Sequence, residues 1–104
     1  MGFLNSFALK QMAKEHYVAL HKREGFGRPP QAEISAIADA AVALDTGSER
    51  KLISALDRFA NVAGGKYPAI ALGVFTICGL AGEFPQYAWA SRTTTEWEMK
   101  RQGL

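Results

Sequence analysis

Cysteine and histidine are scarce in this sequence of 104 residues, which contains one cysteine and two histidines. A single cysteine, Cys78, excludes any internal disulfide and is typical of a protein from a reducing compartment. A structural zinc site needs about four ligands, and His16 and His21 would point about 140° apart on one helix. The sequence therefore predicts no metal site and no cofactor. His16, on an apolar stripe, is expected to be half-buried, and His21, beside Lys22 and Arg23, to be solvated.

A strong excess of one charge is also lacking. The chain has 12 Lys and Arg against 10 Asp and Glu, which gives a net charge of +2. Nucleic-acid-binding proteins usually carry a denser basic stripe, because much of their affinity comes from displacing counterions at many phosphates. A nucleic-acid partner is therefore not the first expectation.

The sequence patterns that carry catalysis are missing. The serines fall at helix caps or on helix faces, without the strained strand-to-helix elbow of hydrolases. Gly64-Gly65-Lys66 lacks the spaced first glycine and the following Ser or Thr of a phosphate-binding loop. The acidic residues are scattered, so no paired carboxylates are available for acid–base chemistry. We therefore expect no enzymatic activity.

No apolar run is long enough to cross a membrane. The uncharged stretch between Lys66 and Glu83 holds 16 residues and three glycines, and a bilayer needs about 20 apolar residues. The segment from Met1 to Leu9 has no basic region of the kind that opens a secretory signal. These features predict a cytoplasmic protein without a membrane span.

Apolar residues, in contrast, are plentiful. The composition of 48% hydrophobic and 21% charged residues is that of a globular protein, and the length suits one compact domain spanning residues 1–104. A chain this small gains much from burying a second face against a copy of itself. We therefore expect a homodimer.

Three segments repeat apolar residues at three- and four-residue spacing, as amphipathic helices do. They are Leu9 to Leu20, Ile34 to Leu44 and Leu52 to Ala63. The first should end at Gly25, with Phe26 folded back on the last turn, and Ser48 should cap the third. Glu33 is expected to lie mostly away from the apolar stripe of the second.

The segment from Ala69 to Gly82 is apolar on every side. Such a helix is central to a core, or it is buried by its own domain on one side and by a second subunit on the other. Both interpretations stay open, and the second favours a dimer. Thr95 and Glu98 form a capping box that predicts a short final helix. The sequence therefore predicts an all-α fold, a compact and dimeric bundle of four main helices plus a short C-terminal helix.

Four aromatic residues gather near the C-terminus. They are Phe84, Tyr87, Trp89 and Trp97. Such side chains either cover the end of a helical core or form an interface, because Trp and Tyr bury much area at little cost in rotamer entropy. The candidate residues for a partner or dimer interface are Tyr67, Leu72, Phe75, Phe84, Tyr87, Trp89 and Trp97.

A helix-turn-helix DNA-binding protein is the alternative. Ile34 to Leu56 gives two helices around a glycine-containing turn, and Arg50 and Lys51 lie near the start of the second helix. However, residues 31–60 hold three positive against five negative charges. This balance disfavours binding to phosphates.

In length, in its three amphipathic segments and in the uncharged segment from Ala69 to Gly82, the chain resembles the small bacterial antiactivators of quorum sensing. The resemblance implies a homodimer that occupies the dimerisation surface of a LuxR-type transcription factor and so prevents DNA binding. It offers no motif whose functional residues can be carried over. We therefore predict a small regulatory protein that binds a partner protein and inhibits it sterically.

Overall fold

The structure, a computed structural model, describes residues 5–104. Helices joined by short connections make up this part of the chain, which contains no β-strand. They are α1 (Ser6–Arg23), α2 (Gln31–Val42), α3 (Glu49–Val62), α4 (Tyr67–Glu83) and α5 (Ala88–Arg101), with short 3-10 turns at η1 (Ala43–Thr46) and η2 (Pro85–Tyr87). The predicted all-α fold is confirmed.

Local chemistry sets the ends of the first and third helices. The side-chain oxygens of Asn5 and Ser48 each accept a hydrogen bond from the backbone N–H three residues ahead, and so cap α1 and α3. After α1, Gly25 adopts a φ of 87°, and the N–H of Phe26 donates to the carbonyl of His21 at 3.0 Å. This closing motif turns Phe26 back over the helix, as the sequence predicts.

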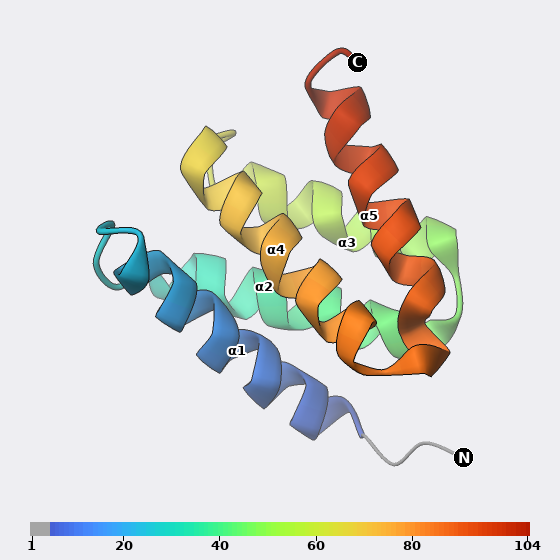
Figure 1. The fold of residues 1–104 in the computed structure, drawn as a ribbon. Helices are drawn as coiled ribbons and strands as arrows, with labels where there is room; N and C mark the ends of the chain where they lie inside the picture. The colour runs from blue at the N-terminus through green and yellow to red at the C-terminus, as the bar shows by residue number, and fades with distance from the viewer. Residues whose placement is uncertain (1–4) are drawn as a thin grey trace.

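The helices form two layers. In Figure 1, α1, α4 and α5 lie in front, and α2 and α3 run antiparallel behind them. Helix α4 is flanked by α1 on one side and α5 on the other, and it also contacts α2. None of the helices in residues 5–104 combines the length and apolar character needed to cross a bilayer.

Most of the circumference of α4 is buried within the single chain. Its buried residues are Ala69, Ile70, Leu72, Gly73, Val74, Thr76, Ile77, Leu80 and Ala81. Gly73 lies so close to α3 that a β-carbon there would fall 2.3 Å from Cε2 of Phe59. The segment from Ala69 to Gly82 is therefore mainly core, which explains why it is apolar on every side.

One narrow face of α4 remains open to solvent. We call it the outer ridge, and it consists of Tyr67, Ala71, Phe75 and Gly79 at four-residue spacing. Tyr67, Phe75 and Gly79 are exposed, and Ala71 is half-buried. This face is the part of the uncharged segment that a partner or a second subunit can still reach.

The last helix begins earlier than the sequence indicated. Helix α5 starts at Ala88 and has 14 residues, so the capping box predicted at Thr95 is wrong, since Thr95 lies in mid-helix. The buried face of α5 already includes Ala90, Thr93 and Thr94. Threonine usually favours helix caps and strands. Here Thr93 and Thr94 are helical because α5 packs against α3 and α4, and this packing lets the helix begin earlier.

Candidate protein-binding site

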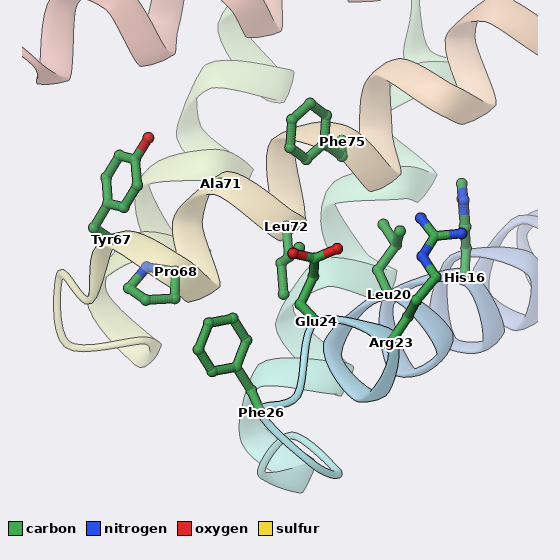
Figure 2. A pocket seen from close by; sticks show the side chains of 10 residues that line it. All are labelled: His16, Leu20, Arg23, Glu24, Phe26, Tyr67, Pro68, Ala71, Leu72 and Phe75. Atoms are coloured by element: carbon green, nitrogen blue, oxygen red, sulfur yellow. The ribbon is translucent and has the colours of Figure 1, made fainter.

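A concave site lies between the first and fourth helices, and we call it the α1–α4 groove. Its volume is about 600 Å³, within the range of about 300–1,000 Å³ usual for ligand sites. Figure 2 shows the side chains that line it, from α1, the loop after α1 and the N-terminal half of α4. The lining residues are His16, Leu20, Arg23, Glu24, Phe26, Tyr67, Pro68, Ala71, Leu72 and Phe75.

Three aromatic side chains around this groove are unusually exposed. Tyr67 is 66% exposed, Phe75 is 62% exposed and Phe26 is 51% exposed. Leu20 and Leu72, which also line the groove, are buried. Large apolar surface grouped in one place marks a contact site, whereas scattered apolar residues on a surface do not. Aromatic rings also bury a large area when they are covered.

Polar groups line the α1 side of the groove. Arg23 and Glu24 are both exposed, and neither takes part in the ion pairs found in residues 5–104, which are Lys66–Glu33 and Arg92–Glu96. His16 is exposed beside them, so its predicted role as a half-buried packing residue is wrong. The ring of His16 lies against Gly79 of α4, where a β-carbon would fall 2.8 Å from Cε1 of His16, and glycine has no side chain with which to cover the ring.

A polar cluster around the buried carboxylate of Glu33 links the two walls of the groove. The hydroxyl of Tyr17 on α1 donates to Oε1 of Glu33 on α2 at 2.9 Å. Nζ of Lys66, directly before α4, lies 3.1 Å from Oε2 of the same carboxylate. Burial, together with the hydrogen bond to Glu33, raises the pKa of Tyr17 far above its ordinary value. The expectation that Glu33 faces solvent is wrong, because these two partners compensate its burial.

His21 supports the loop that carries Phe26. It is buried, and its Nδ1 lies 2.8 Å from the carbonyl oxygen of Gly27. Its ring packs edge-on against Phe26, with 5.6 Å between the ring centroids. The prediction that His21 is solvated is wrong, because the chain turns at Gly25 and folds back over it.

The structure brings three of the seven predicted interface residues together at the groove: Tyr67, Leu72 and Phe75. The other four lie outside it. Phe84 and Trp89 are half-buried and pack against the core. Tyr87 and Trp97 are only 4% and 6% exposed, so little of either side chain is available to a partner.

Tyr87 and Trp97 join the C-terminal region to the middle of the chain. The Tyr87 hydroxyl donates to Asp45 at 3.1 Å, and Nε1 of Trp97 donates to Asp57 at 2.8 Å. Thr93 makes a third bond of this kind, with its hydroxyl 2.8 Å from Oε1 of Glu49. The geometry therefore indicates that Tyr87 and Trp97 cover the core and do not form an interface.

Phe26, Leu20, Arg23 and Glu24 belong to the groove but were not among the predicted site residues. The sequence pattern predicts only that Phe26 folds back on the last turn of α1. The signal that could have found the site is the four-residue alternation from Tyr67 onward along α4, because an exposed ridge on a buried helix must be covered or functional.

Cys78 is half-buried between α4 and α5, with its Sγ 3.8 Å from the hydroxyl oxygen of Thr95. Burial raises the pKa of its thiol, which favours the unreactive protonated form at neutral pH. Among residues 5–104, no three His, Cys, Asp or Glu side chains are grouped so as to hold a metal ion.

Comparisons with family models, with curated proteins and with solved structures found no match to this chain.

Proposed function

We propose that this protein is a small regulator that binds a partner protein in the α1–α4 groove and inhibits it by steric occlusion. The observation that carries the proposal is the grouping of Tyr67, Phe75 and Phe26 around one concave site, each more than half exposed. Aromatic side chains that flank a groove are the usual anchors of protein interfaces. The regulator needs no chemistry of its own.

The occupant that best fits the groove is an amphipathic helix of the partner. Such a helix lays its apolar face in a hydrophobic groove through anchors spaced three, four and seven residues apart. Arg23 and Glu24 on the α1 side could pair with charges of either sign at the margin of that helix.

The resemblance to quorum-sensing antiactivators suggests a LuxR-type transcription factor as the partner. Occupying the dimerisation surface of such a regulator would prevent its dimerisation and its binding to DNA. The proposal requires the cytoplasmic location expected from the sequence, since the regulator acts on DNA inside the bacterium.

Calorimetric titration of the protein with a purified LuxR-type regulator tests the proposal. We expect Phe75→Ala to weaken binding by about 30-fold or more, which corresponds to the ~2 kcal/mol of an interface hot spot. The matched control is Val62→Ala, at a residue on α3 that is 45% exposed and outside the groove. Equal losses for the two variants, or no binding by the wild type, would refute the proposal.

DNA binding is the second candidate, and one observation favours it. Helix α3 presents Arg50, Lys51 and Arg58, all exposed, and none of them takes part in an ion pair within residues 5–104. Asp57 and Glu49, which would repel phosphates, accept hydrogen bonds from α5. In a helix-turn-helix protein, exposed basic residues like these on the second helix would contact the phosphates of the DNA.

Duplex binding measured at several salt concentrations separates the two candidates. If the protein is a helix-turn-helix protein, its affinity for duplex DNA should fall steeply as the salt concentration rises. The Arg50→Ala/Lys51→Ala variant should then lose this affinity. Phe75→Ala, at the opposite site, should not change it. If the protein is a steric regulator, neither the wild type nor either variant should bind duplex DNA at physiological salt.

A further inference from the structure

A second concave site lies on the other flank of α1, and we call it the α1–α2 groove. Its volume is about 630 Å³. It is lined by α1, by the connector that joins α1 to α2 (Figure 1) and by the first turn of α2. None of its lining residues belongs to the α1–α4 groove. They include Lys14, Glu15, Val18, Lys22, Arg28 and Ile34.

The α1–α2 groove accounts for the whole net charge of the protein. Lys14, Lys22 and Arg28 line it, against the single carboxylate of Glu15. Without these four residues, the totals of 12 basic and 10 acidic residues fall to nine of each. The rest of the chain is therefore neutral, and the excess of +2 belongs to this one site.

No neighbouring carboxylate neutralises the three cations of the groove. Neither of the ion pairs found in residues 5–104 includes them. On a helix, such pairs form between residues three or four apart. At those distances from Lys14 and Lys22, the only charged residue is Lys10, which is itself a cation. The groove therefore presents positive charge whose counter-charge an anionic partner can supply.

The connector between α1 and α2 holds the backbone of Arg28 in place. Nδ1 of His21 lies 2.8 Å from the carbonyl oxygen of Gly27, directly before it. Pro29 and Pro30 follow directly, and proline fixes the backbone φ. An anion thus meets a cation whose backbone is already ordered, which lowers the cost of binding.

The floor of the groove is apolar. Ile34 is buried and Val18 is half-buried, and Val18 lies midway between Lys14 and Lys22 at four-residue spacing. Four residues rise about 6 Å along a helix. Alternate residues of an extended chain, which point to the same side, are about 6.6 Å apart. An extended segment can therefore set an acidic, an apolar and a second acidic side chain opposite Lys14, Val18 and Lys22.

A helical ligand fits this groove less well than an extended one. From Gln11 to Lys22 the groove runs about 16 Å along α1, so its volume corresponds to a cross-section of about 40 Å². An extended chain, about 4.8 Å by 10 Å, has a cross-section of about 50 Å². A helix about 10 Å across has one of about 80 Å².

We propose that the α1–α2 groove binds an extended acidic segment of a partner protein, in which two acidic residues flank an apolar one at alternate positions. The site does not rest on the proposed function, because the two grooves share no lining residue. Nucleic acid fits less well. DNA-binding proteins typically contact more phosphates, about six to ten, than three cations can neutralise, and phosphates gain nothing from an apolar floor.

Fluorescence anisotropy of a labelled peptide titrated with the full chain tests the proposal. The probe is a nine-residue peptide of serine and glycine with glutamate, leucine and glutamate at alternate central positions. At low ionic strength we expect the wild type to bind it with a dissociation constant below about 1 mM. Serine in place of the leucine should raise this constant by about fivefold, because the contact with the apolar floor is lost.

The double variant Lys14→Glu/Lys22→Glu is the decisive case. It should no longer bind the acidic peptide, and it should bind the matching peptide with lysines in place of the glutamates. That gain also shows that the variant is folded. The matched control is Lys51→Glu/Lys100→Glu, which makes the same charge change at two exposed residues outside the groove. The control should keep the dissociation constant for the acidic peptide within about twofold of the wild-type value.

Three results overturn the proposal: a wild type that shows no saturable binding up to about 1 mM, equal losses in the two double variants, and binding of duplex DNA without binding of the peptide. Phe75→Ala, in the α1–α4 groove, should leave peptide binding unchanged. Failure of the regulator titration would therefore refute the proposed function alone, and failure of the peptide titration would refute this inference alone.

Discussion

At the scale of single residues, Glu33 shows how tertiary contacts override a sequence pattern. It is 1% exposed, although its place in the second amphipathic segment indicated a solvent-facing side chain. A carboxylate tolerates such burial only with partners for its oxygens, and here Tyr17 and Lys66 supply them. The three residues belong to α1, to α2 and to the position before α4. One polar cluster therefore links the two walls of the groove.

Removing the Tyr17 hydroxyl should destabilise the protein. We expect Tyr17→Phe to lower the free energy of unfolding by about 1–3 kcal/mol, because it leaves a buried carboxylate oxygen without its donor. Denaturant titration at neutral pH measures the loss. Tyr67→Phe is the control, since it removes a hydroxyl from an exposed ring and should change stability little. A loss no larger than that of the control would contradict the role given to the cluster.

The same hydroxyl makes stability depend on alkaline pH. Burial and the hydrogen bond to Glu33 raise the pKa of Tyr17 in the folded state above its ordinary value of 10.0. Below pH about 10 both states keep the proton, so the contribution of Tyr17 to stability is fully present. Above that pH the unfolded chain releases the proton while the folded chain retains it, and stability falls.

Denaturant titrations between neutral pH and about pH 11 check this dependence. The wild type should lose more stability over that range than Tyr17→Phe, which has no hydroxyl to titrate at this position. Parallel curves for the two proteins would show that Tyr17 does not contribute to the pH dependence.

At the scale of elements, α4 leaves no space for an added side chain at one glycine and open space for one at another. Its buried face approaches α3 closely at Gly73, where a β-carbon would fall 2.3 Å from the ring of Phe59. Its C-terminal end is open, and a β-carbon at Gly82 would meet nothing within 4 Å. Both glycines have helical backbones, so only their surroundings distinguish them.

Alanine substitutions at these two glycines should therefore have opposite effects. Gly73→Ala should lower the free energy of unfolding by about 1–3 kcal/mol through overpacking against Phe59. Gly82→Ala should leave it unchanged or raise it by up to about 1 kcal/mol, because alanine favours the helix. Thermal unfolding of the two variants beside the wild type measures both effects. Equal changes in the same direction would contradict the packing described for α4.

Sequence patterns predicted most elements because local signals mark them. The stop at Gly25 and the cap at Ser48 depend on neighbours a few residues away, so they could be predicted from the chain alone. The start of α5 could not, since packing of Thr93 and Thr94 overrides the capping signal at Thr95.

At the scale of the whole molecule, the groove exists because α1 and α4 pack side by side while α5 covers the other flank of α4 (Figure 1). Tyr67, Leu72 and Phe75 were predicted as interface residues from their chemistry. Phe26 and Leu20 were not, because their place beside α4 depends on a contact between distant segments. For the same reason, the sequence left open whether Tyr87 and Trp97 were core or interface, whereas their burial places both in the core.

We propose that the α1–α4 groove is the surface of this molecule that contacts the regulator. Backbone amide resonances of the isotope-labelled protein, followed by NMR while an unlabelled LuxR-type regulator is added, test it most directly. We expect chemical-shift changes at Leu20, Phe26, Tyr67, Ala71 and Phe75, and no changes at Arg50, at Arg58 or on the outer face of α5. Shifts centred on α3 or α5, with the groove resonances unmoved, would contradict it.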